Sequence, residues 1–589
     1  MLNKICLIIV AIITVNSIIA QSTNKLLKYL SNNESKVIEK VNMPGEVYKI
    51  TDKVSGRSTY KNLGEYKPKN KIHKTTVAVD TTVIYPDLVD TIQFEGMYKY
   101  WTTIDIGTIG PIPIIAGDVN ENGRAELYGE RYNTYQHINE RSIYEYNPDI
   151  KAFEYKADLP WDSITYYVDF TQIYDINMDG KKEIFITGSE QIYDSIQALD
   201  VARTFKLSDS TNLPTEIDFD YRQCNQMNDP LWGEYDNREG TDLFYCGESC
   251  DLRVAAARYD KNTNSAETVF VYLVPDSIFY LAGTSNCDID NDGFADLVTG
   301  GLRGDVVVFE YQEDIENYKD VWYGDAGTYN VYIHFYTNDI DKNGKKEFWV
   351  GGAAFYDGVP KTKLTCFEAI GNNKYEAQHV IEIDNRFGFD AYNGFAVDID
   401  KDGTEEIGLC LDQTFMILKF NGSENKWGFD LFYLKLNYTE NSSYSGALMY
   451  DADGNGNKEI LIQMDDDPPG LGSKKILTKI YKPTDLVGVA KTGKVLNTYK
   501  LYQNYPNPFN PSTTIKYSIP CSTECYSVLQ TTLKVYDVLG REVTTLVNKE
   551  QKPGNYEVGF NGDNLPSGVY LIKMTAGEYT KTIKSLLVK

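Results

Sequence analysis

Residues 288–301 read Asp-Ile-Asp-Asn-Asp-Gly-Phe-Ala-Asp-Leu-Val-Thr-Gly-Gly, an oxygen-rich loop that runs directly into a short β-type pattern. With Asp288 as position 1, the segment has an acid at positions 1, 3, 5 and 9 and Gly at position 6. Near-copies, some with Asn at position 3 or 5, start at residues 118, 175, 339, 398 and 451. We call these six segments the acidic loops. Their recurrence indicates a repeat architecture.

The loop pattern provides the ligands that a hard cation prefers. Oxygen-bearing side chains at alternate positions converge on one point where the chain turns sharply, and Gly at position 6 permits a backbone geometry that a Cβ atom resists. Ca²⁺ takes about 6 to 8 oxygen ligands. In each loop the side chains at positions 1, 3, 5 and 9, with a backbone carbonyl such as that of Phe294, provide most of this set. The six loops therefore predict about six Ca²⁺ sites. The predicted side-chain ligands are Asp118, Asn120, Asn122, Glu126, Asp175, Asn177, Asp179, Glu183, Asp288, Asp290, Asp292, Asp296, Asp339, Asp341, Asn343, Glu347, Asp398, Asp400, Asp402, Glu406, Asp451, Asp453, Asn455 and Glu459.

An EF-hand starts with the same spacing but requires a bidentate Glu at position 12 and flanking helices. Position 12 of the acidic loops holds a residue with no carboxylate, namely Gly129, Ile186, Thr299, Val350, Leu409 and Ile462. The residues after each loop are strand-like, which also argues against EF-hands and dockerins. A solvated acidic turn without metal is the alternative interpretation.

The period of the repeat predicts the architecture. The first aspartates of successive loops are separated by 57, 113, 51, 59 and 53 residues, so the long gap hides one further copy. Residues 234–247 fit that place in degenerate form, with Tyr235 at position 1 and Asp242 one residue early, and we expect weak or no metal binding there. Units of about 50 to 60 residues with several short strands have the size of four-stranded propeller blades. We therefore expect a seven-bladed β-propeller over residues 87–483.

The unit around residues 165–207 illustrates the expected strands, which lie at 165–173, 184–187, 195–199 and 204–207. With these loops and strands, the sequence resembles the FG-GAP or VCBS repeat family, found in integrin α-subunit heads and many bacterial surface proteins. The resemblance implies that each calcium loop joins the first two strands of a blade.

Composition and the N-terminal segment limit the possible functions. The net charge of −26 and pI near 4.7 argue against nucleic-acid binding. Residues 1–20 have the features of a secretory signal peptide, with a retained membrane anchor as the alternative. After its removal no stretch is long and apolar enough to cross a bilayer. Residues 21–86 are expected to form a leader with little fold of its own, and residues 91–106 to complete the last blade.

Residues 484–500 form a linker, and the last 89 residues, 501–589, have their own pattern. Three segments define it: Tyr-Pro-Asn-Pro-Phe-Asn-Pro at 505–511, Leu-Lys-Val-Tyr-Asp-Val-Leu-Gly at 533–540 and Leu-Pro-Ser-Gly-Val-Tyr at 565–570. Alternating polarity between Pro and Gly turns predicts an Ig-like β-sandwich of about seven strands. The segments resemble the type A C-terminal sorting domain of type IX secretion in Gram-negative bacteria. This resemblance implies the secretion machinery as partner and a secreted or outer-membrane surface location. An ordinary adhesive Ig-like module is the alternative.

Catalytic motifs are not apparent, because the four histidines have no spaced partner and no Gly-x-Ser-x-Gly, His-Glu-x-x-His or phosphate loop occurs. Export permits disulfides, with Cys246 to Cys224 or Cys250, and Cys521 to Cys525, as the nearest pairs. The sequence favours an exported, calcium-binding, non-catalytic binding or adhesion protein for a glycan or protein ligand. A polysaccharide lyase or hydrolase on the same scaffold, and a structural spacer, are the alternatives.

Overall fold

A computed structural model describes residues 36–40, 47–52, 58–62, 79–107, 114–133, 138–161, 165–191, 198–223, 227–247, 252–274, 281–301, 304–356, 359–384, 386, 393–411, 413–423, 426–437, 442–466, 475–484, 499–519, 529–551, 554–577 and 579–589. These residues form an all-β fold whose only described helices are two short 3₁₀ turns, η1 (Pro86–Leu88) and η2 (Thr91–Phe94). The all-β prediction is confirmed.

Seven sheets of antiparallel strands follow one another along the described chain, and the first four are as follows. The first sheet holds β6 (Ile115–Gly117), β7 (Glu126–Asn133), β8 (Ile138–Asn147) and β9 (Ala152–Asp158). The second holds β10 (Thr165–Tyr174), β11 (Glu183–Gln191), β12 (Ala198–Lys206) and β13 (Glu216–Gln223). The third holds β14 (Met227–Gly233), β15 (Asp242–Gly247), β16 (Arg253–Asp260) and β17 (Ser265–Leu273). The fourth holds β18 (Leu281–Cys287), β19 (Asp296–Gly301), β20 (Asp305–Gln312) and β21 (Asn317–Asp325).

The last three sheets repeat this order. The fifth holds β22 (Ile333–Thr337), β23 (Glu347–Tyr356), β24 (Val359–Gly371) and β25 (Lys374–Asp384). The sixth holds β26 (Gly394–Val397), β27 (Glu406–Leu411), β28 (Thr414–Phe420) and β29 (Phe429–Leu436). The seventh holds β30 (Ser442–Tyr450), β31 (Glu459–Asp466) and β32 (Lys475–Pro483). Four-stranded units were therefore predicted correctly.

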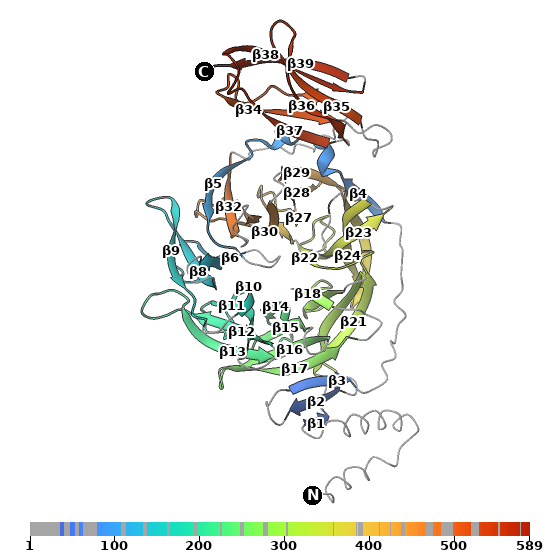
Figure 1. The fold of residues 1–589 in the computed structure, drawn as a ribbon. Helices are drawn as coiled ribbons and strands as arrows, with labels where there is room; N and C mark the ends of the chain where they lie inside the picture. Colours follow the sequence, from blue (N-terminus) through green and yellow to red (C-terminus); the bar gives the residue numbers. More distant parts are fainter. Residues whose placement is uncertain are drawn as a thin grey trace, which may run out of the picture.

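The seventh sheet takes its fourth strand from the other end of the chain. Strand β5 (Tyr98–Ile104) pairs antiparallel with β32, as expected for residues 91–106. Figure 1 shows β5, in blue, beside β32, in orange, and the sheets arranged around a common centre with their first strands innermost. From the first to the sixth sheet, the first strands of neighbouring sheets contact one another. Strand β30 of the seventh sheet contacts β27 of the sixth, and β32 contacts β7 of the first sheet. The two ends of the series are thereby joined.

Apolar side chains fill the space between neighbouring sheets. All residues of the second strands β15, β19 and β27 are buried, because sheets cover them on both faces. The cluster around Ile104 and Ile106 joins the two ends of the series, since it includes Leu127 from the first sheet and Ile480 from the last. Strand β27, for example, accordingly follows its acidic loop as a mostly apolar run.

The leader segment contains more structure than expected. Strands β1 (Lys36–Lys40), β2 (Val47–Asp52) and β3 (Ser58–Asn62) form an antiparallel sheet, and β3 contacts β17. Strand β4 (Asp80–Ile84) pairs parallel with β25 and gives the fifth sheet an extra edge strand. The expectation that residues 21–86 have little fold of their own does not hold for the described strands, because β1 to β3 pair with one another and β4 pairs with an exposed sheet edge.

Other expectations also differ from the structure. The segments 195–199 and 204–207 were expected as two strands, but their residues 198–199 and 204–206 belong to the single strand β12, and β13 was missed. The predicted signal peptide lies outside the described residues, as do Cys224, Cys250, Cys521 and Cys525. No helix in the described part of the chain is long and apolar enough to span a membrane.

The C-terminal unit consists of two sheets around one core. One sheet holds β33 (Lys500–Leu501), β34 (Ser512–Ile519) and β37 (Gly554–Asn561), and the other holds β36 (Glu542–Gln551), β35 (Leu529–Tyr536), β38 (Gly568–Ala576) and β39 (Tyr579–Leu587). Both contribute buried side chains, such as Tyr517 from one sheet and Ile572 from the other.

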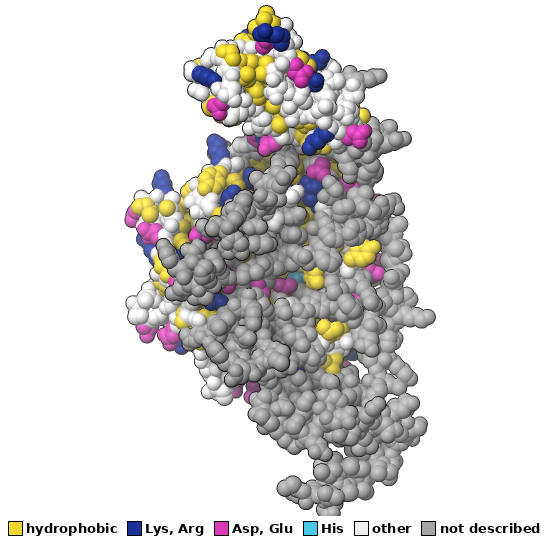
Figure 2. Space-filling view, viewed as in Figure 1, with side chains coloured by type: hydrophobic (Ala, Val, Ile, Leu, Met, Phe, Trp, Pro, Cys, Tyr) yellow, Lys and Arg dark blue, Asp and Glu magenta, His cyan; other side chains and the backbone are white. Residues whose placement is uncertain are grey.

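Figure 2 shows that the described acidic side chains on this view of the molecule are interspersed with basic and hydrophobic ones.

Candidate metal centres in the acidic loops

Each acidic loop joins the first and second strands of its sheet. Position 9 is in every case the first residue of the second strand, so the sheet fixes its backbone. The predicted placement of these loops is therefore confirmed, whereas their occupancy by calcium stays a prediction. The loops are found in the first, second, fourth, fifth, sixth and seventh sheets.

One hydrogen-bond pattern shapes all six loops. In the loop at 288, the Gly293 N–H donates to Asp288 Oδ2 (3.1 Å), and the Phe294 N–H donates to Asp292 Oδ1 (3.0 Å). The Ile289 N–H donates to Asp296 Oδ2 (2.8 Å). The same three bonds, from positions 6, 7 and 2 to positions 1, 5 and 9, recur in the other five loops. Backbone amides thus pre-organise the side-chain oxygens before any ion binds.

Backbone geometry explains the Gly at position 6. Its φ is positive in all six loops, from 79° at Gly123 to 99° at Gly293, a region that disfavours residues with a Cβ. Position 4 also has a positive φ, for example 60° at Asn291. Two left-handed residues so close together turn the chain back on itself and bring positions 1, 3 and 5 to one side.

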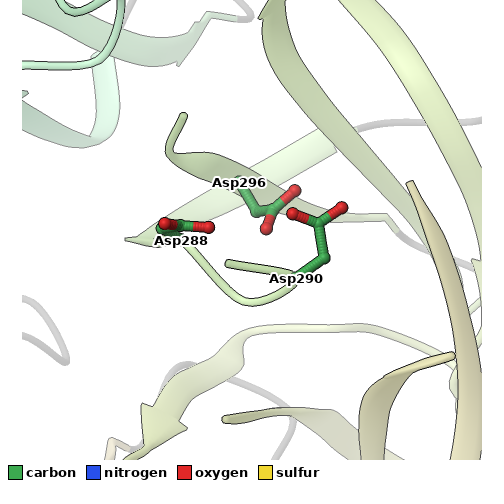
Figure 3. A group of neighbouring side chains, drawn as sticks. All are labelled: Asp288, Asp290 and Asp296. Carbon is green, nitrogen blue, oxygen red and sulfur yellow. The ribbon is translucent and has the colours of Figure 1, made fainter. Parts of the chain in front are cut away.

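The predicted carboxylates meet in four of the loops. Oxygens of Asp288, Asp290 and Asp296 lie within 4.8 Å of one another, and Figure 3 shows these side chains pointing toward one another. Equivalent trios at positions 1, 3 and 9 occur in the loops at 339, 398 and 451. The loops at 118 and 175 have Asn at position 3, and no acidic trio was found in their described residues. There the amide oxygen takes the place of a carboxylate.

Burial governs the electrostatics at position 9. The position-9 side chains are almost fully buried in all six loops. Burial raises the pKa of Glu126, Glu183 and Glu459 to about 7, and that of Asp296 and Glu347 to about 8. Neighbouring loop carboxylates also raise these pKa values by like-charge repulsion. Without a cation the loops hold negative charge at a high energetic cost.

Several buried oxygens in these clusters have no hydrogen-bond partner among the described residues. They are Glu126 Oε1, Glu459 Oε1, Asp339 Oδ1 and Glu310 Oε2, the last from β20. A buried acceptor without a partner costs about 1–3 kcal/mol, and more when it is charged. A cation bound among the loop carboxylates would provide a partner for these oxygens.

The degenerate copy in the third sheet has a different register from the predicted one. Asp242 is the first residue of β15 and buried, as position 9 is elsewhere, and Asn237 has the positive φ of position 4. Position 3 is therefore Asp236. Gly240 lies at position 7, one residue after the position that Gly has in the acidic loops. The error arose because Gly240 was used to set the register. The expectation of weak or no metal binding here stays a prediction.

Residues outside the repeat motif also contact the loops. The Tyr375 hydroxyl of β25 donates to Asp296, and the Tyr318 hydroxyl of β21 donates to Asp242, so a tyrosine of the following sheet covers each aspartate. The Asn373 N–H donates to Asp290 Oδ2 (2.6 Å). The sequence analysis missed these residues. The one available signal was that position 9 is Asp, not Glu, in these two sheets.

Comparison with known proteins identifies the C-terminal unit. Residues 503–589 match the family described as secretion system C-terminal sorting domain. The C-terminal unit is a sorting domain. Its presence confirms the predicted type IX sorting signal and indicates a secreted or cell-surface protein that interacts with the secretion machinery. No curated protein sequence matches the chain.

Solved structures resemble the whole chain only loosely. A fungal alcohol oxidase of the AA5 family, in complex with copper, is 11% identical with a TM-score of 0.38, covering 84% of this chain and 100% of that one. Sqt1 of Saccharomyces cerevisiae is 10% identical with a TM-score of 0.38, covering 71% and 96%. A 6-phosphogluconolactonase-like protein of Bacteroides uniformis is 10% identical with a TM-score of 0.34, covering 55% and 88%. Scores this low carry no functional argument.

Proposed function

We propose that the chain is an exported, calcium-binding β-propeller of the FG-GAP or VCBS kind, with seven blades and an Ig-like sorting domain, that acts as a non-catalytic binding or adhesion protein. The observation that carries this proposal is the recurrence of one loop geometry between the first two strands of six sheets around a common centre. The pairing of β5 with β32 also supports a closed propeller, since it unites both ends of the series in one blade.

The donor set of the loop at 288 fits calcium. All its side-chain donors are oxygens, as hard Ca²⁺ prefers, and Ca²⁺–oxygen distances of about 2.3–2.6 Å allow opposite ligands to be nearly 5 Å apart. The trio at positions 1, 3 and 9 lies within 4.8 Å, and Glu310 adds a buried oxygen that has no partner among the described residues. Asp288, Asp290, Asp292 and Asp296 would hold the ion, with Glu310 beside them.

A bound calcium ion would supply positive charge to a cluster of buried carboxylates. The chain's own residues do the rest: backbone amides orient positions 1 and 5, and the sheet fixes position 9. Because the ion binds only the folded loop, each independent site adds about 2.7 kcal/mol when free calcium is a hundredfold above its dissociation constant. Calcium is thus proposed as a stabiliser of the scaffold and not as a catalyst.

The opposite end of the sheets is the proposed ligand-binding surface. Consecutive strands are antiparallel, so the second strands end and the third strands begin at the end away from the acidic loops. The number of residues between these two strands varies from two, 412–413, to eight, 467–474, while five of the six acidic loops have eight residues between strands. Loops of variable length on a rigid scaffold are where binding residues concentrate.

A panel of glycans and polysaccharides tests this proposal. The purified full chain is assayed for retention and for product formation, with calcium and after its removal. We expect calcium-dependent retention of at least one glycan without products. New reducing ends or unsaturated products would contradict a non-catalytic role and favour the polysaccharide lyase or hydrolase. No retention on any glycan would exclude this ligand class and direct the search to protein ligands.

A further inference from the structure

The residue on the third strand directly opposite position 9 differs in charge between sheets. The register pairs Glu126 with Glu145, Asp242 with Arg258 and Glu347 with Glu368, and extending the other ladders by one residue gives the remaining partners. In sheet order these opposite residues are Glu145, Lys206, Arg258, Glu310, Glu368, Lys419 and Lys482. Acids and cations therefore occupy the same structural position, next to the same loop.

Lys419 contacts three carboxylates of its own loop. Its ammonium donates to Asp400 Oδ2 (2.6 Å), Asp402 Oδ2 (2.7 Å) and Glu406 Oε1 (2.8 Å). These acceptors are positions 3, 5 and 9, three of the four predicted calcium ligands. An ammonium group has three N–H donors, so each is used by one ligand carboxylate. The Lys419 nitrogen lies at the place where the carboxylates converge.

The remaining ligand, Asp398 at position 1, keeps the backbone hydrogen bond from Gly that position 1 accepts in all six loops. Asp398 Oδ1 accepts the Asp402 N–H (3.2 Å), and Asp398 Oδ2 accepts the Gly403 N–H (3.1 Å). The Lys419 ammonium group already donates to the other three ligands, so an incoming divalent cation would have to displace it from the same oxygens.

The loop at 288 provides the contrast. Its opposite residue is Glu310, whose Oε2 is buried with no partner among the described residues and whose carboxylate groups with Asp290 and Asp292 within 4.8 Å. At the position where the sixth sheet supplies a positive charge, the fourth sheet supplies another negative one. Lys482 in the seventh sheet is intermediate, since it contacts Asp453 while Glu459 Oε1 has no hydrogen-bond partner in the described part of the chain.

We propose that Lys419 is the built-in cation of the loop at residues 398–406, so that this loop binds no calcium although its sequence matches the calcium-binding pattern. The inference rests on the proposed calcium function of the other loops. It lowers the expected number of ions from six to five. The acidic loop of the sixth sheet is then the one whose stability does not depend on calcium.

Two position-3 variants of the full chain form a matched test. Asp290→Ala and Asp400→Ala remove the same side-chain oxygens, the first from a loop without the internal lysine and the second from the loop with it. Calcium bound per chain is measured by equilibrium dialysis and atomic emission. We expect Asp290→Ala to lose one ion and Asp400→Ala to lose none. Loss of one ion from Asp400→Ala would overturn the proposal while leaving the calcium function intact.

Lys419→Met tests the lysine itself, with the exposed Lys426→Met as control. Without the ammonium group the buried Glu406 is left without its cation beside the more exposed Asp400 and Asp402. We therefore expect the variant to melt several degrees lower in chelator and to regain its stability by binding one additional calcium ion. An unchanged melting temperature in chelator would overturn the proposal. If neither aspartate variant changes the ion count because the chain binds no calcium, the proposed function fails, and the melting temperature in chelator still decides the role of Lys419.

Discussion

The position-9 carboxylate is the residue on which each acidic loop depends. It begins the second strand, accepts the N–H of position 2 and lies buried under the neighbouring strands. A shorter side chain at this position requires compensation, because Asp242 and Asp296, the two aspartates there, each accept a tyrosine hydroxyl from the next sheet. One buried carboxylate thus links loop geometry, sheet and neighbouring sheet.

The raised pKa of these carboxylates predicts how the metal-free protein responds to pH. Burial raises the pKa of Glu126 from its ordinary 4.5 to about 7. The stabilisation of the protonated fold is complete below pH 4.5 and is lost as pH rises through 7, because the folded state must then bury a negative charge. At about 1.36 kcal/mol per pKa unit, this amounts to roughly 3 kcal/mol for Glu126 alone.

Thermal unfolding between pH 5 and pH 8 measures this effect. Protein made metal-free by dialysis is expected to lose melting temperature steadily across this range, whereas calcium-loaded protein changes much less because the ion favours the ionised carboxylates. Equal pH dependence with and without calcium would show that the buried carboxylates do not face the ion.

At the scale of the element, strand β5 carries the closure of the seven sheets. Its residue Ile104 is buried against apolar side chains of the last and the first sheet, whereas Tyr100 on the same strand is 59% exposed. Ile104→Ala is expected to lower the free energy of unfolding by about 2–4 kcal/mol, as for other large-to-small core substitutions.

Tyr100→Ala is the matched control for this strand and is expected to cost under about 1 kcal/mol. Urea denaturation of both variants provides the comparison. Equal losses of stability would mean that β5 only lies against the last sheet and does not join the two ends.

The sequence predicted the first two strands of each sheet far better than the last two. The acidic loops keep a fixed spacing, so positions 1 to 9 locate the turn and the start of strands such as β19 without a structure. The hairpins that follow differ in length: Lys419 comes 13 residues after Glu406, and Lys482 comes 23 residues after Glu459. No fixed offset could find the residue opposite position 9. Only the pairing of strands brings Lys419 to its loop.

At the scale of the whole molecule, few polar contacts join the sorting domain to the seven sheets. Lys500 pairs with Asp90 (2.7 Å) and Lys516 with Glu95 (2.8 Å), and both lysine side chains are 42% exposed. Ion pairs as exposed as these contribute at most about 1 kcal/mol each. The sheets are therefore expected to fold without the sorting domain, which fits a segment that serves export.

Removal of residues 491–589 tests this independence. The shortened protein is expected to melt within a few degrees of the full chain and to keep its response to calcium, as measured by scanning calorimetry. Lys516→Ala in the full chain provides a control for the interface and is expected to change the melting temperature little. A large drop in both proteins would show that the sorting domain is part of the scaffold.

Calcium-dependent stability of the seven sheets is the central claim, and one melting experiment tests it most directly. The full chain is heated in excess chelator, in calcium and in magnesium at the same ionic strength. We predict that chelator lowers the melting temperature substantially, that calcium restores it, and that magnesium does not, because Mg²⁺ demands a tighter octahedral shell than these loops offer. Identical melting curves in chelator and calcium would contradict the account.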